Sequence, residues 1–444
     1  MLKSVLVGKN RINLVDRKKG RFPGANTFTV IVGKNGTGKS RLLRSIALGH
    51  LLEVQASPKL LDRETRKDTD LVVSLEWDEL PSRTIAVSTS PFDKFPLVRT
   101  SNTDLPYKYL GLRGLPSTNL GVTYLGKVFG TLLEAILNRP ETSRAIADVL
   151  AYLDYEPAIE VSLQFAPPGL IERLTSGEKV RAAFPSPDWA PAYRFWEFAP
   201  PHHREHLLRV MQRIDWSSRR KVGVRITPYG VEGLGQIEAS LDETLELTQA
   251  GLVKLSTFTL RKKGDGARFN VNDASSGEQA VVMGLLGIGS QIRDGSLILI
   301  DEPEVCLHPE WQEKYIHLLF RTFSQYRGCH FIIATHSPQI VAELPTGNCF
   351  VLTMEDRQVH RATEFSGRSV DFQLASLFNA PGHKNEYLLR MALGVFADIS
   401  KGRELSAESL EVLEVFKRVH DQLKNDDPVK ELISVIFEAR SRDA

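Results

Sequence analysis

The chain has 444 residues, and its hydrophobic fraction of 42% and charged fraction of 25% are typical of a folded globular protein rather than a disordered or fibrous one. Its 56 basic and 54 acidic residues nearly balance, so no strong overall field would attract nucleic acid or an anionic membrane. The length exceeds what one hydrophobic core usually organises, and we expect one large interrupted domain or two to three modules.

The spacing of the cysteines and the lengths of the apolar segments indicate the cellular compartment of the protein. Cys306, Cys329 and Cys349 follow neither the spacing of a metal site nor that of a disulfide framework. Basic residues interrupt the first apolar run too early for a signal peptide, and no segment reaches the roughly 18 consecutive apolar residues of a membrane-spanning helix. We therefore expect a cytoplasmic protein without a membrane partner.

In chain order, the first predicted elements are a strand, a loop and a helix. Residues 28–32 have the composition of a buried strand, and residues 40–52 have the apolar spacing of a helix. Two β-rich runs follow at 71–77 and 84–89, separated by a turn-like segment. They predict a hairpin or two neighbouring strands.

From about residue 100 to 252 the pattern is mainly helical and is broken by proline-containing loops, which is typical of an insertion. Residues 252–273 predict a hairpin, because the Asp-Gly step at Asp265 supports positive φ. Helices then alternate with apolar strands as far as residue 353, which predicts an α/β fold. Beyond about residue 371 the pattern is helical.

The segment from Gly33 to Ser40 matches the phosphate-binding loop in full, between a predicted strand and a predicted helix. Its glycines let backbone N–H groups face a β-phosphate, Lys39 supplies a point charge, and Ser40 offers a hydroxyl to magnesium. A glycine-rich turn without a ligand is the alternative, but it does not explain why both flanking elements meet the motif's condition. The predicted nucleotide contacts are Gly33, Asn35, Gly36, Gly38, Lys39, Ser40 and Arg41.

An apolar strand at 297–300 ends in the paired carboxylates Asp301 and Glu302. Alone, such a pair is more often structural than catalytic. Beside a phosphate-binding loop, Asp301 is suited to hold magnesium, usually through water, and Glu302 to polarise the attacking water as a general base.

Two further motifs accompany this pair. Residues 275–279 precede a helix and offer a serine hydroxyl, a glycine amide and a helix N-terminus to a γ-phosphate, although Glu278 equally suits an ordinary capping box. The predicted contacts are Ser276, Gly277 and Gln279. His336 follows a predicted strand, where nucleotide sites of open α/β sheets lie.

In this order the motifs resemble those of ABC-type ATPases. Residues 275–279 resemble the signature motif, His336 resembles the switch histidine that reaches the γ-phosphate, and residues 304–309 resemble the D-loop that runs along a partner subunit. The E-P-E-x-x-L-H-P form resembles the SMC-like and overcoming-lysogenization-defect branch. The resemblance covers roughly residues 1 to 100 and 250 to 355.

This resemblance implies an α/β fold, namely an ABC-type P-loop ATPase head with a mixed sheet, a helical insertion and a helical C-terminal tail. It also implies ATP and Mg²⁺ as cofactors, slow regulatory ATP hydrolysis, and a homodimer or higher homo-oligomer that closes head to tail around ATP. The sequence departs from the family in lacking a clear Q-loop glutamine, and we assign Asp93 the metal-sensing role instead. The expected domains are the head's N-terminal lobe at 1–100, the insertion at 101–252, the head's C-terminal lobe at 253–370 and an interaction segment at 371–444.

Two polar segments of the insertion leave alternatives open. His202, His203 and His206 with Glu205 are better explained as a solvated helix start than as a metal site. A basic stretch suits either nucleic acid phosphates or a solvated or subunit-contacting face. Its members are Arg204, Arg209, Arg213, Arg219, Arg220 and Lys221.

The rest of the chain indicates what the closing of such an ATPase dimer would control. Proline breaks and the absence of a sustained heptad argue against a long coiled-coil arm, and residues 354–444 leave little room for a Toprim nuclease. Such a compact ATPase resembles the ATPase subunits of antiphage systems such as Septu or PARIS, which act with a separately encoded nuclease. The alternative is a DNA-repair or chromosome-maintenance ATPase that acts directly on DNA.

The C-terminal helices carry two predicted apolar faces, which serve either a partner protein or the chain's own core. The first consists of Tyr387, Leu388, Leu389, Leu393, Val395 and Phe396, and the second of Leu410, Leu413, Val415, Phe416 and Val419.

Overall fold

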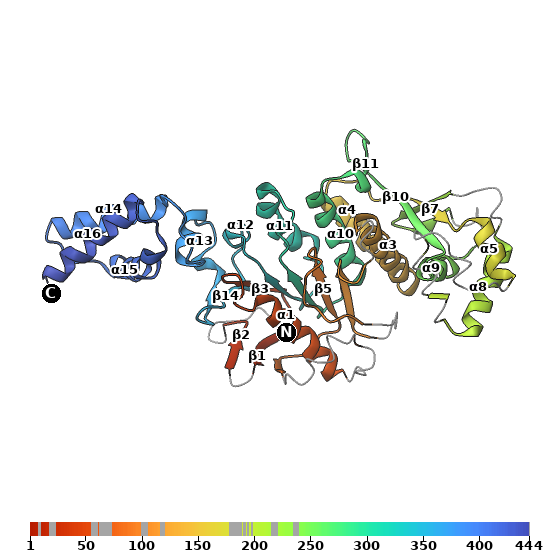
Figure 1. Ribbon diagram of the computed structural model, residues 1–444, viewed down its shortest axis with the longest axis horizontal. Helices are drawn as coiled ribbons and strands as arrows, with labels where there is room; N and C mark the ends of the chain where they lie inside the picture. Colours follow the sequence, from red (N-terminus) through yellow and green to blue (C-terminus); the bar gives the residue numbers. More distant parts are fainter. Residues whose placement is uncertain are drawn as a thin grey trace.

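A computed structural model describes most of the chain: residues 1–7, 10–16, 24–54, 61, 73–98, 105–115, 120–176, 189, 192, 195–196, 199–214, 221–233 and 239–443. Along its longest axis the molecule has three parts, which are the C-terminal helices, a central α/β body and a lobe built on a second sheet (Figure 1). In this part of the chain no helix combines the length and the apolar character that a membrane-spanning segment requires.

The central body is built on a seven-stranded sheet. Its strands, in spatial order, are β15 (Val359–Arg361), β14 (Cys349–Thr353), β3 (Thr27–Val32), β13 (His330–Ala334), β12 (Leu297–Asp301), β5 (Thr84–Ser88) and β6 (Tyr107–Gly111). All neighbours are parallel except β15, which pairs antiparallel with β14. Helices cover both faces, so the inner strands are buried at every position, as expected for a parallel sheet in an α/β fold. The predicted α/β class with a mixed sheet is confirmed.

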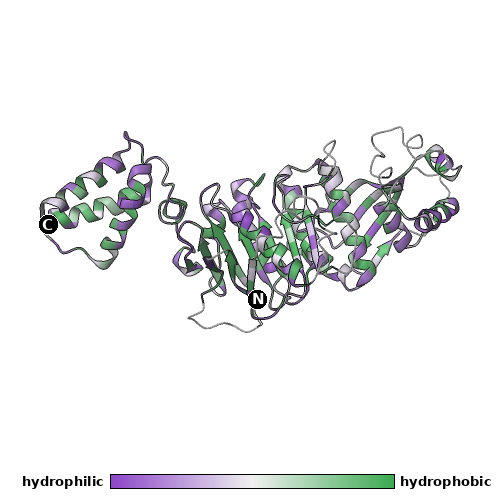
Figure 2. Ribbon diagram, turned by 60° about the horizontal axis from the view of Figure 1, so that its bottom comes forward, coloured by the Kyte–Doolittle hydropathy of each residue, from purple (hydrophilic) through white to green (hydrophobic). Residues whose placement is uncertain are grey.

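Alternate residues of these strands pack into two different hydrophobic cores, one on each face of the sheet. Val30 and Ile300 belong to one core, together with α3 (Leu120–Asn138), α4 (Thr142–Tyr152), α10 (Ser276–Gln291) and α11 (Pro309–Thr322). Ile31 and Leu299 belong to the other, together with α1 (Lys39–Glu53). Successive strand residues point to opposite faces, so one sheet serves both cores. Figure 2 shows the sheet as mostly hydrophobic.

A small sheet and two short helices complete the body. The small sheet has the order β2 (Asn10–Asn13), β1 (Leu2–Val7) and β4 (Val73–Trp77), and it shares the core of α1. The short helices are α12 (Pro338–Ala342) and α13 (Val370–Ser376).

The two β-rich runs at 71–77 and 84–89 do not form the expected hairpin, nor are they neighbours. Residues 73–77 form β4, which pairs with β1, whereas residues 84–88 form β5 between β12 and β6 in the central sheet. Their compositions explain the separation. β5 is apolar enough to be buried on both faces, while Ser74 and Glu76 give β4 one polar face.

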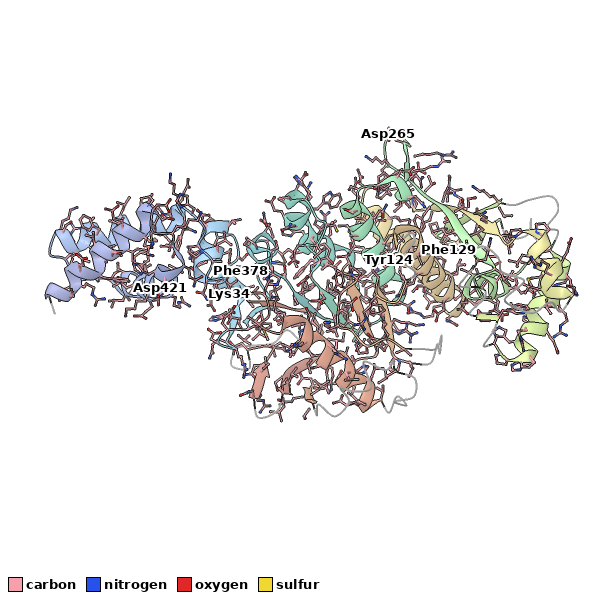
Figure 3. The ribbon with its side chains drawn as sticks, viewed as in Figure 1. Lys34, Tyr124, Phe129, Asp265, Phe378 and Asp421 are labelled. Carbon is pink, nitrogen blue, oxygen red and sulfur yellow. The ribbon has the colours of Figure 1, made fainter. Side chains whose placement is uncertain are left out.

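The predicted hairpin is present in a second sheet, which is antiparallel. Its order is β11 (Arg268–Asn270), β10 (Val253–Arg261), β7 (Ile159–Phe165), β8 (Lys221–Thr227) and β9 (Gly230–Glu232). β10 pairs with β11, and Gly264 and Gly266 have φ of 97° and 64° in the turn between them. Asp265, at this turn, lies well apart from Lys34 (Figure 3).

Within the described part of residues 101–252 the structure has helices, as predicted, and also four strands that were not predicted. The helices are α3, α4, α5 (Pro168–Thr175), α8 (Pro201–Arg213) and α9 (Leu241–Gln249). β6 extends the central sheet, and β7, β8 and β9 build most of the second one. β7 and β8 alternate apolar and polar residues, which is the pattern of a half-buried strand.

The C-terminal helices have a hydrophobic core of their own. They are α14 (Glu386–Ser400), α15 (Ala407–Val419) and α16 (Pro428–Asp443), and we call them the C-terminal unit. Leu388, Val395, Leu413, Phe416 and Val419 are buried within it. Leu393, Phe396 and Leu410 are exposed. Each predicted apolar face therefore divides between the unit's own core and solvent.

Candidate nucleotide site

Strand order brings three sequence motifs to one edge of the central sheet. β3, β13 and β12 are adjacent and parallel, with Ile31 opposite Ala334 and Ala334 opposite Asp301. The phosphate-binding loop follows β3, the His336 loop follows β13, and the acidic pair stands at the carboxyl end of β12. All three therefore leave the sheet at the carboxyl edge, where open α/β sheets bind ligands.

The phosphate-binding loop has the backbone that its glycines permit. Gly38, at the start of α1, has φ of 99°, which side chains with a Cβ rarely adopt. A Cβ on Gly33 would lie 2.9 Å from the hydroxyl of Thr37 and 3.0 Å from Cβ of Met354. The loop thus delivers backbone N–H groups to the N-terminus of α1, where an anion is favoured.

Lys39 is buried at the centre of the site. Its Nζ donates to the carbonyls of Gly33 at 2.9 Å and Lys34 at 3.3 Å, and to Nε2 of His336 at 2.6 Å. Burial lowers the pKa of Lys39, although four neighbouring carboxylates act in the opposite direction.

His336 lies between Lys39 and Glu302 of the acidic pair. Burial, and then the Lys39 charge, lower the pKa of His336, so its ring is a neutral acceptor for the lysine. Nε2 of His336 also lies 3.6 Å from Oε1 of Glu302. Glu302 has a φ of 48°, and its N–H donates to the carbonyl of Ala334. The structure therefore brings together the predicted Lys39, Glu302 and His336.

Ser40 and Asp301 provide oxygen ligands suited to magnesium. The hydroxyl of Ser40 donates to Oδ1 of Asp301 at 3.0 Å. Burial, reinforced by Glu302, Asp93 and Glu304, raises the pKa of Asp301 to about 7, despite the bond from Ser40. Negative charge is thus in excess here, and a divalent cation would compensate it.

The remaining ligands of such an ion would come from outside the protein. Among the described residues, no three side chains of His, Cys, Asp or Glu converge to form a metal site. Mg²⁺ is commonly bound by one or two protein oxygens with phosphate oxygens and water, and the pair Ser40 and Asp301 fits that arrangement.

Asp93 lies close enough to Asp301 to affect its pKa, but its carboxylate already has protein partners. Oδ1 accepts from the N–H of Phe95 at 3.0 Å, and Oδ2 accepts from the hydroxyl of Tyr109. Burial raises the pKa of Asp93. These contacts hold the loop after β5, and the metal-sensing role of Asp93 stays a prediction.

The signature segment begins α10 with the capping box that was the alternative reading of its residues. The hydroxyl of Ser275 accepts from the N–H of Glu278 at 3.3 Å, and the carboxylate of Glu278 accepts from the N–H of Ser275 at 3.1 Å. Gln279 donates to the carbonyls of Asn272 and Ala274, each at 3.2 Å. Ser276 is exposed and Gly277 is buried. A capping role and an exposed phosphate-binding face are compatible, because they use different atoms.

The structure does not bring the signature segment to the phosphate-binding loop of the same chain. Both segments are described in full, and no hydrogen bond or ion pair joins residues 275–279 to residues 33–41. α10 shares its core with α3 and α4, whereas α1 belongs to the core on the opposite face of the sheet.

Gly277 packs against the D-loop. A Cβ at this position would lie 2.7 Å from the carbonyl oxygen of Cys306, a backbone atom that cannot easily move. We expect Gly277→Ala to destabilise the protein by about 1–3 kcal/mol because of this overlap. Gly284, in the same helix, has open space for a Cβ, so Gly284→Ala should stabilise by about 0.5–1 kcal/mol. Urea unfolding of both variants checks this, and equal midpoints would contradict the close approach.

Two carboxylates belong to the site although no sequence motif indicates their contacts there. Glu304 and Glu355 both reach it, and Oε1 of Glu355 accepts from the N–H of Lys34 at 2.7 Å. A hollow of about 220 Å³ lies beside the phosphate-binding loop. It is lined by Val7, Asn10, Ile12, Thr37, Gly38, Arg41, Leu42, Ser45, Met354 and Arg357. Glu355 follows β14, which is parallel to β3, and therefore lies at the same sheet edge. This position can be predicted only when the strand order is known.

Residues 171–342 match the family model described as "AAA domain, putative AbiEii toxin, Type IV TA system". This segment includes the signature residues, the acidic pair and His336, and it lies beyond the phosphate-binding loop.

Two curated proteins match over short segments. Retron Ec83 probable ATPase of Escherichia coli is 40% identical over 60 residues, which cover 13% of this chain and 10% of that protein. Protein ea59 of Escherichia phage lambda is 33% identical over 84 residues, which cover 19% of this chain and 16% of that protein. The chain therefore spans far less than two thirds of either relative.

Three solved structures are similar at low identity. Stu0660 of Streptococcus thermophilus is 12% identical with a TM-score of 0.34, covering 99% of this chain and 93% of that one. UvrA2 from Deinococcus radiodurans is 16% identical with a TM-score of 0.27, covering 87% and 39%. The Smc head domain of Pyrococcus furiosus, bound to the C-terminal domain of ScpA, is 12% identical with a TM-score of 0.30, covering 82% and 97%. Likeness at these TM-scores assigns no function.

The family match and the motif geometry lead to one coarse assignment. The description of the matched family names an AAA domain. The strand order brings Lys39, Asp301, Glu302 and His336 to one edge of the sheet. Residues 171–342 are therefore similar to an AAA domain, and their acidic pair and His336 lie at the same sheet edge as the phosphate-binding loop that precedes them.

Proposed function

We propose that the protein is an ATP-driven switch that closes as a dimer around ATP and controls a separately encoded nuclease. The observation that carries the hydrolytic part is the convergence of Lys39, His336 and Glu302, with Nε2 of His336 2.6 Å from the lysine and 3.6 Å from the glutamate. A cation, a neutral imidazole and a carboxylate at one sheet edge suit phosphoryl transfer to water.

The chain's own residues would divide this work. Lys39 would exchange its carbonyl and imidazole acceptors for β- and γ-phosphate oxygens. Ser40 and Asp301 would hold Mg²⁺, which supplies electrostatic stabilisation of the phosphates when bound. Glu302 would orient water and accept its proton, and His336 would contact the γ-phosphate. The hollow lined by Arg41 and Met354 adjoins the loop and would be available to the nucleoside.

A second copy of the chain would complete the site. Ser276 is exposed at the N-terminus of α10, so its hydroxyl and the helix dipole are available to a phosphate from outside the chain. The segment makes no hydrogen bond to its own phosphate-binding loop. Head-to-tail pairing would place the Ser276 of one copy against the nucleotide of the other.

We expect Ser276→Arg to leave folding and ATP binding intact and to prevent dimer closure, because the bulky cation would occupy the place of the partner's γ-phosphate. Mixing it with Lys39→Ala would produce a heterodimer with one intact composite site. ATPase activity of the mixture should recover to a fraction of wild type, although each variant alone is inactive. No recovery, with heterodimers shown by mass, would contradict sites shared between subunits.

The C-terminal unit is the part best placed to convey the nucleotide state to a partner. Nζ of Lys34, within the phosphate-binding loop, donates at 3.2 Å to Oε1 of Gln422, which lies in the segment that joins α15 to α16. Lys34 lies on the side of the body that faces the unit (Figure 3). Leu393 and Phe396, one turn apart on α14, are 53% and 38% exposed.

A relative named as the probable ATPase of a retron, and a family description that names a putative toxin, support a role beside an effector in antiphage defence.

Replacing Leu393 and Phe396 together with serine should abolish co-purification of a nuclease encoded next to this gene, and should leave ATPase activity unchanged. The loss follows from removing exposed apolar area without disturbing the unit's core. Leu410→Ser, on α15 and 45% exposed, is the matched control. Undiminished co-purification by the double variant would contradict docking on α14, and ATPase activity stimulated by DNA alone would favour direct action on DNA.

A further inference from the structure

Glu304 lies in the D-loop segment, yet its side chain turns inward to the His336 loop. Its Oε2 accepts from the hydroxyl of Thr335 at 2.8 Å, and its Oε1 accepts from the backbone N–H of His336. One carboxylate thus fixes two successive residues at the end of β13. Within the described residues, neither oxygen of Glu304 forms a hydrogen bond with Ser40 or Asp301, the predicted magnesium ligands.

The contact belongs to a chain of hydrogen bonds between two loops. The hydroxyl of Thr335 also accepts from the N–H of Ser337 at 2.9 Å. Ser337 Oγ donates to Oε1 of Gln312 at 2.7 Å, and Nε2 of Gln312 donates to the carbonyl of Leu307 at 3.0 Å. The D-loop and the His336 loop are therefore joined at both ends, through Glu304 and through Gln312.

A carboxylate is well suited to this position. Two oxygens on one planar group can accept from a backbone N–H and a hydroxyl that lie side by side, one bond to each oxygen, which an apolar group cannot do. Burial raises the pKa of Glu304, so the donors only partly offset the cost of removing it from water. A buried carboxylate that costs free energy is expected where it supports function.

We propose that Glu304 is a positioning residue for ATP hydrolysis, which holds the backbone of His336 so that its imidazole stays between Lys39 and Glu302. The inference rests on the proposed contact of His336 with the γ-phosphate. Glu304 acts through His336 and contacts neither nucleotide nor water itself. Misplacement of a catalytic group by about 1 Å can cost on the order of 100-fold in rate, and that is the effect expected when Glu304 is removed.

The test measures kcat and KM for Glu304→Ala, His336→Ala and the double variant. Glu304→Ala should lower kcat about 100-fold with little change in KM. In the His336→Ala background it should lower kcat by less than about 2-fold, because two residues that act as a unit are not additive. Glu304→Gln should recover most of the rate, since its amide can accept from the N–H of His336 and donate to Thr335. Glu310→Gln, on the exposed start of α11, is the neutral control.

The outcomes separate this inference from the proposed function. A wild-type rate for His336→Ala would contradict the role of His336 itself. A large loss for His336→Ala with a normal rate for Glu304→Ala, or an equal further loss in both backgrounds, would overturn the role of Glu304. If Glu304→Ala does not fold, Thr335→Val and Thr335→Ser replace it. Valine, which lacks the hydroxyl, should lower kcat more than serine, and equal rates would overturn the proposal.

Discussion

Replacing Lys39 with alanine is expected to abolish measurable ATP binding and turnover. The ammonium is the buried cation of the site, and hydrogen bonds between charged groups contribute about 1.5–3 kcal/mol each. Loss of such bonds to two phosphates should weaken ATP binding by at least about 100-fold. Equilibrium dialysis or calorimetry with ATP and Mg²⁺ measures the change.

Lys34→Ala is the matched control, because it removes a lysine from the same loop whose Nζ contacts Gln422 instead of the site's centre. We expect Lys34→Ala to bind ATP nearly as the wild type does. Lys39→Ala also leaves Asp301, Glu302, Glu304 and Glu355 without their shared cation, so a thermal melt must accompany the binding assay. Near-normal affinity in a folded Lys39→Ala protein would contradict the placement of the phosphates.

Glu302→Gln is expected to retain ATP binding and to stop hydrolysis. The amide preserves the shape of the side chain and its place 3.6 Å from His336, but it cannot accept a proton from water. Removing a general base typically lowers kcat by about 100-fold or more. Single-turnover hydrolysis and the Kd for ATP, measured on the same preparation, separate the two effects.

Glu310→Gln, an exposed glutamate nearby in sequence, provides the control for loss of a carboxylate. A wild-type rate for Glu302→Gln would contradict its assignment as the base. Weakened ATP binding at an unchanged rate would instead indicate a role in holding the nucleotide.

The phosphate-binding loop and the acidic pair were predictable because their chemistry is local in sequence. Gly38 and Lys39 lie in one continuous motif, and Asp301 is the last residue of its own buried strand. Their convergence was not visible in the sequence, since it depends on β13 lying between β3 and β12.

Contacts between distant loops escaped the sequence analysis for the same reason. Glu304 matched the D-loop pattern, which gives no sign that its carboxylate turns to Thr335 and His336. Glu355 is more than 300 residues from Lys34 in the sequence, yet its carboxylate accepts a hydrogen bond from the N–H of Lys34. The strands β7 and β8 were missed despite their alternation, because the surrounding proline-rich helical pattern dominated residues 101–252.

The C-terminal unit shows what amphipathic pattern can and cannot specify. Its helices were expected, and their apolar faces were identified, but the pattern reports burial without naming the partner. Val395 and Phe416 pack within the unit, whereas Leu393 on the same helix as Val395 is exposed. That division depends on how α14, α15 and α16 pack together.

The most direct test of a site shared between two copies is the mass of the Glu302→Gln protein in solution with and without ATP and Mg²⁺. This variant should bind ATP without consuming it, so the closed state should accumulate. We expect the mass of the assembly to double on addition of ATP, and the same protein carrying Ser276→Arg to keep the mass it has without nucleotide. An unchanged mass with saturating ATP, or doubling that persists with Ser276→Arg, would contradict the account.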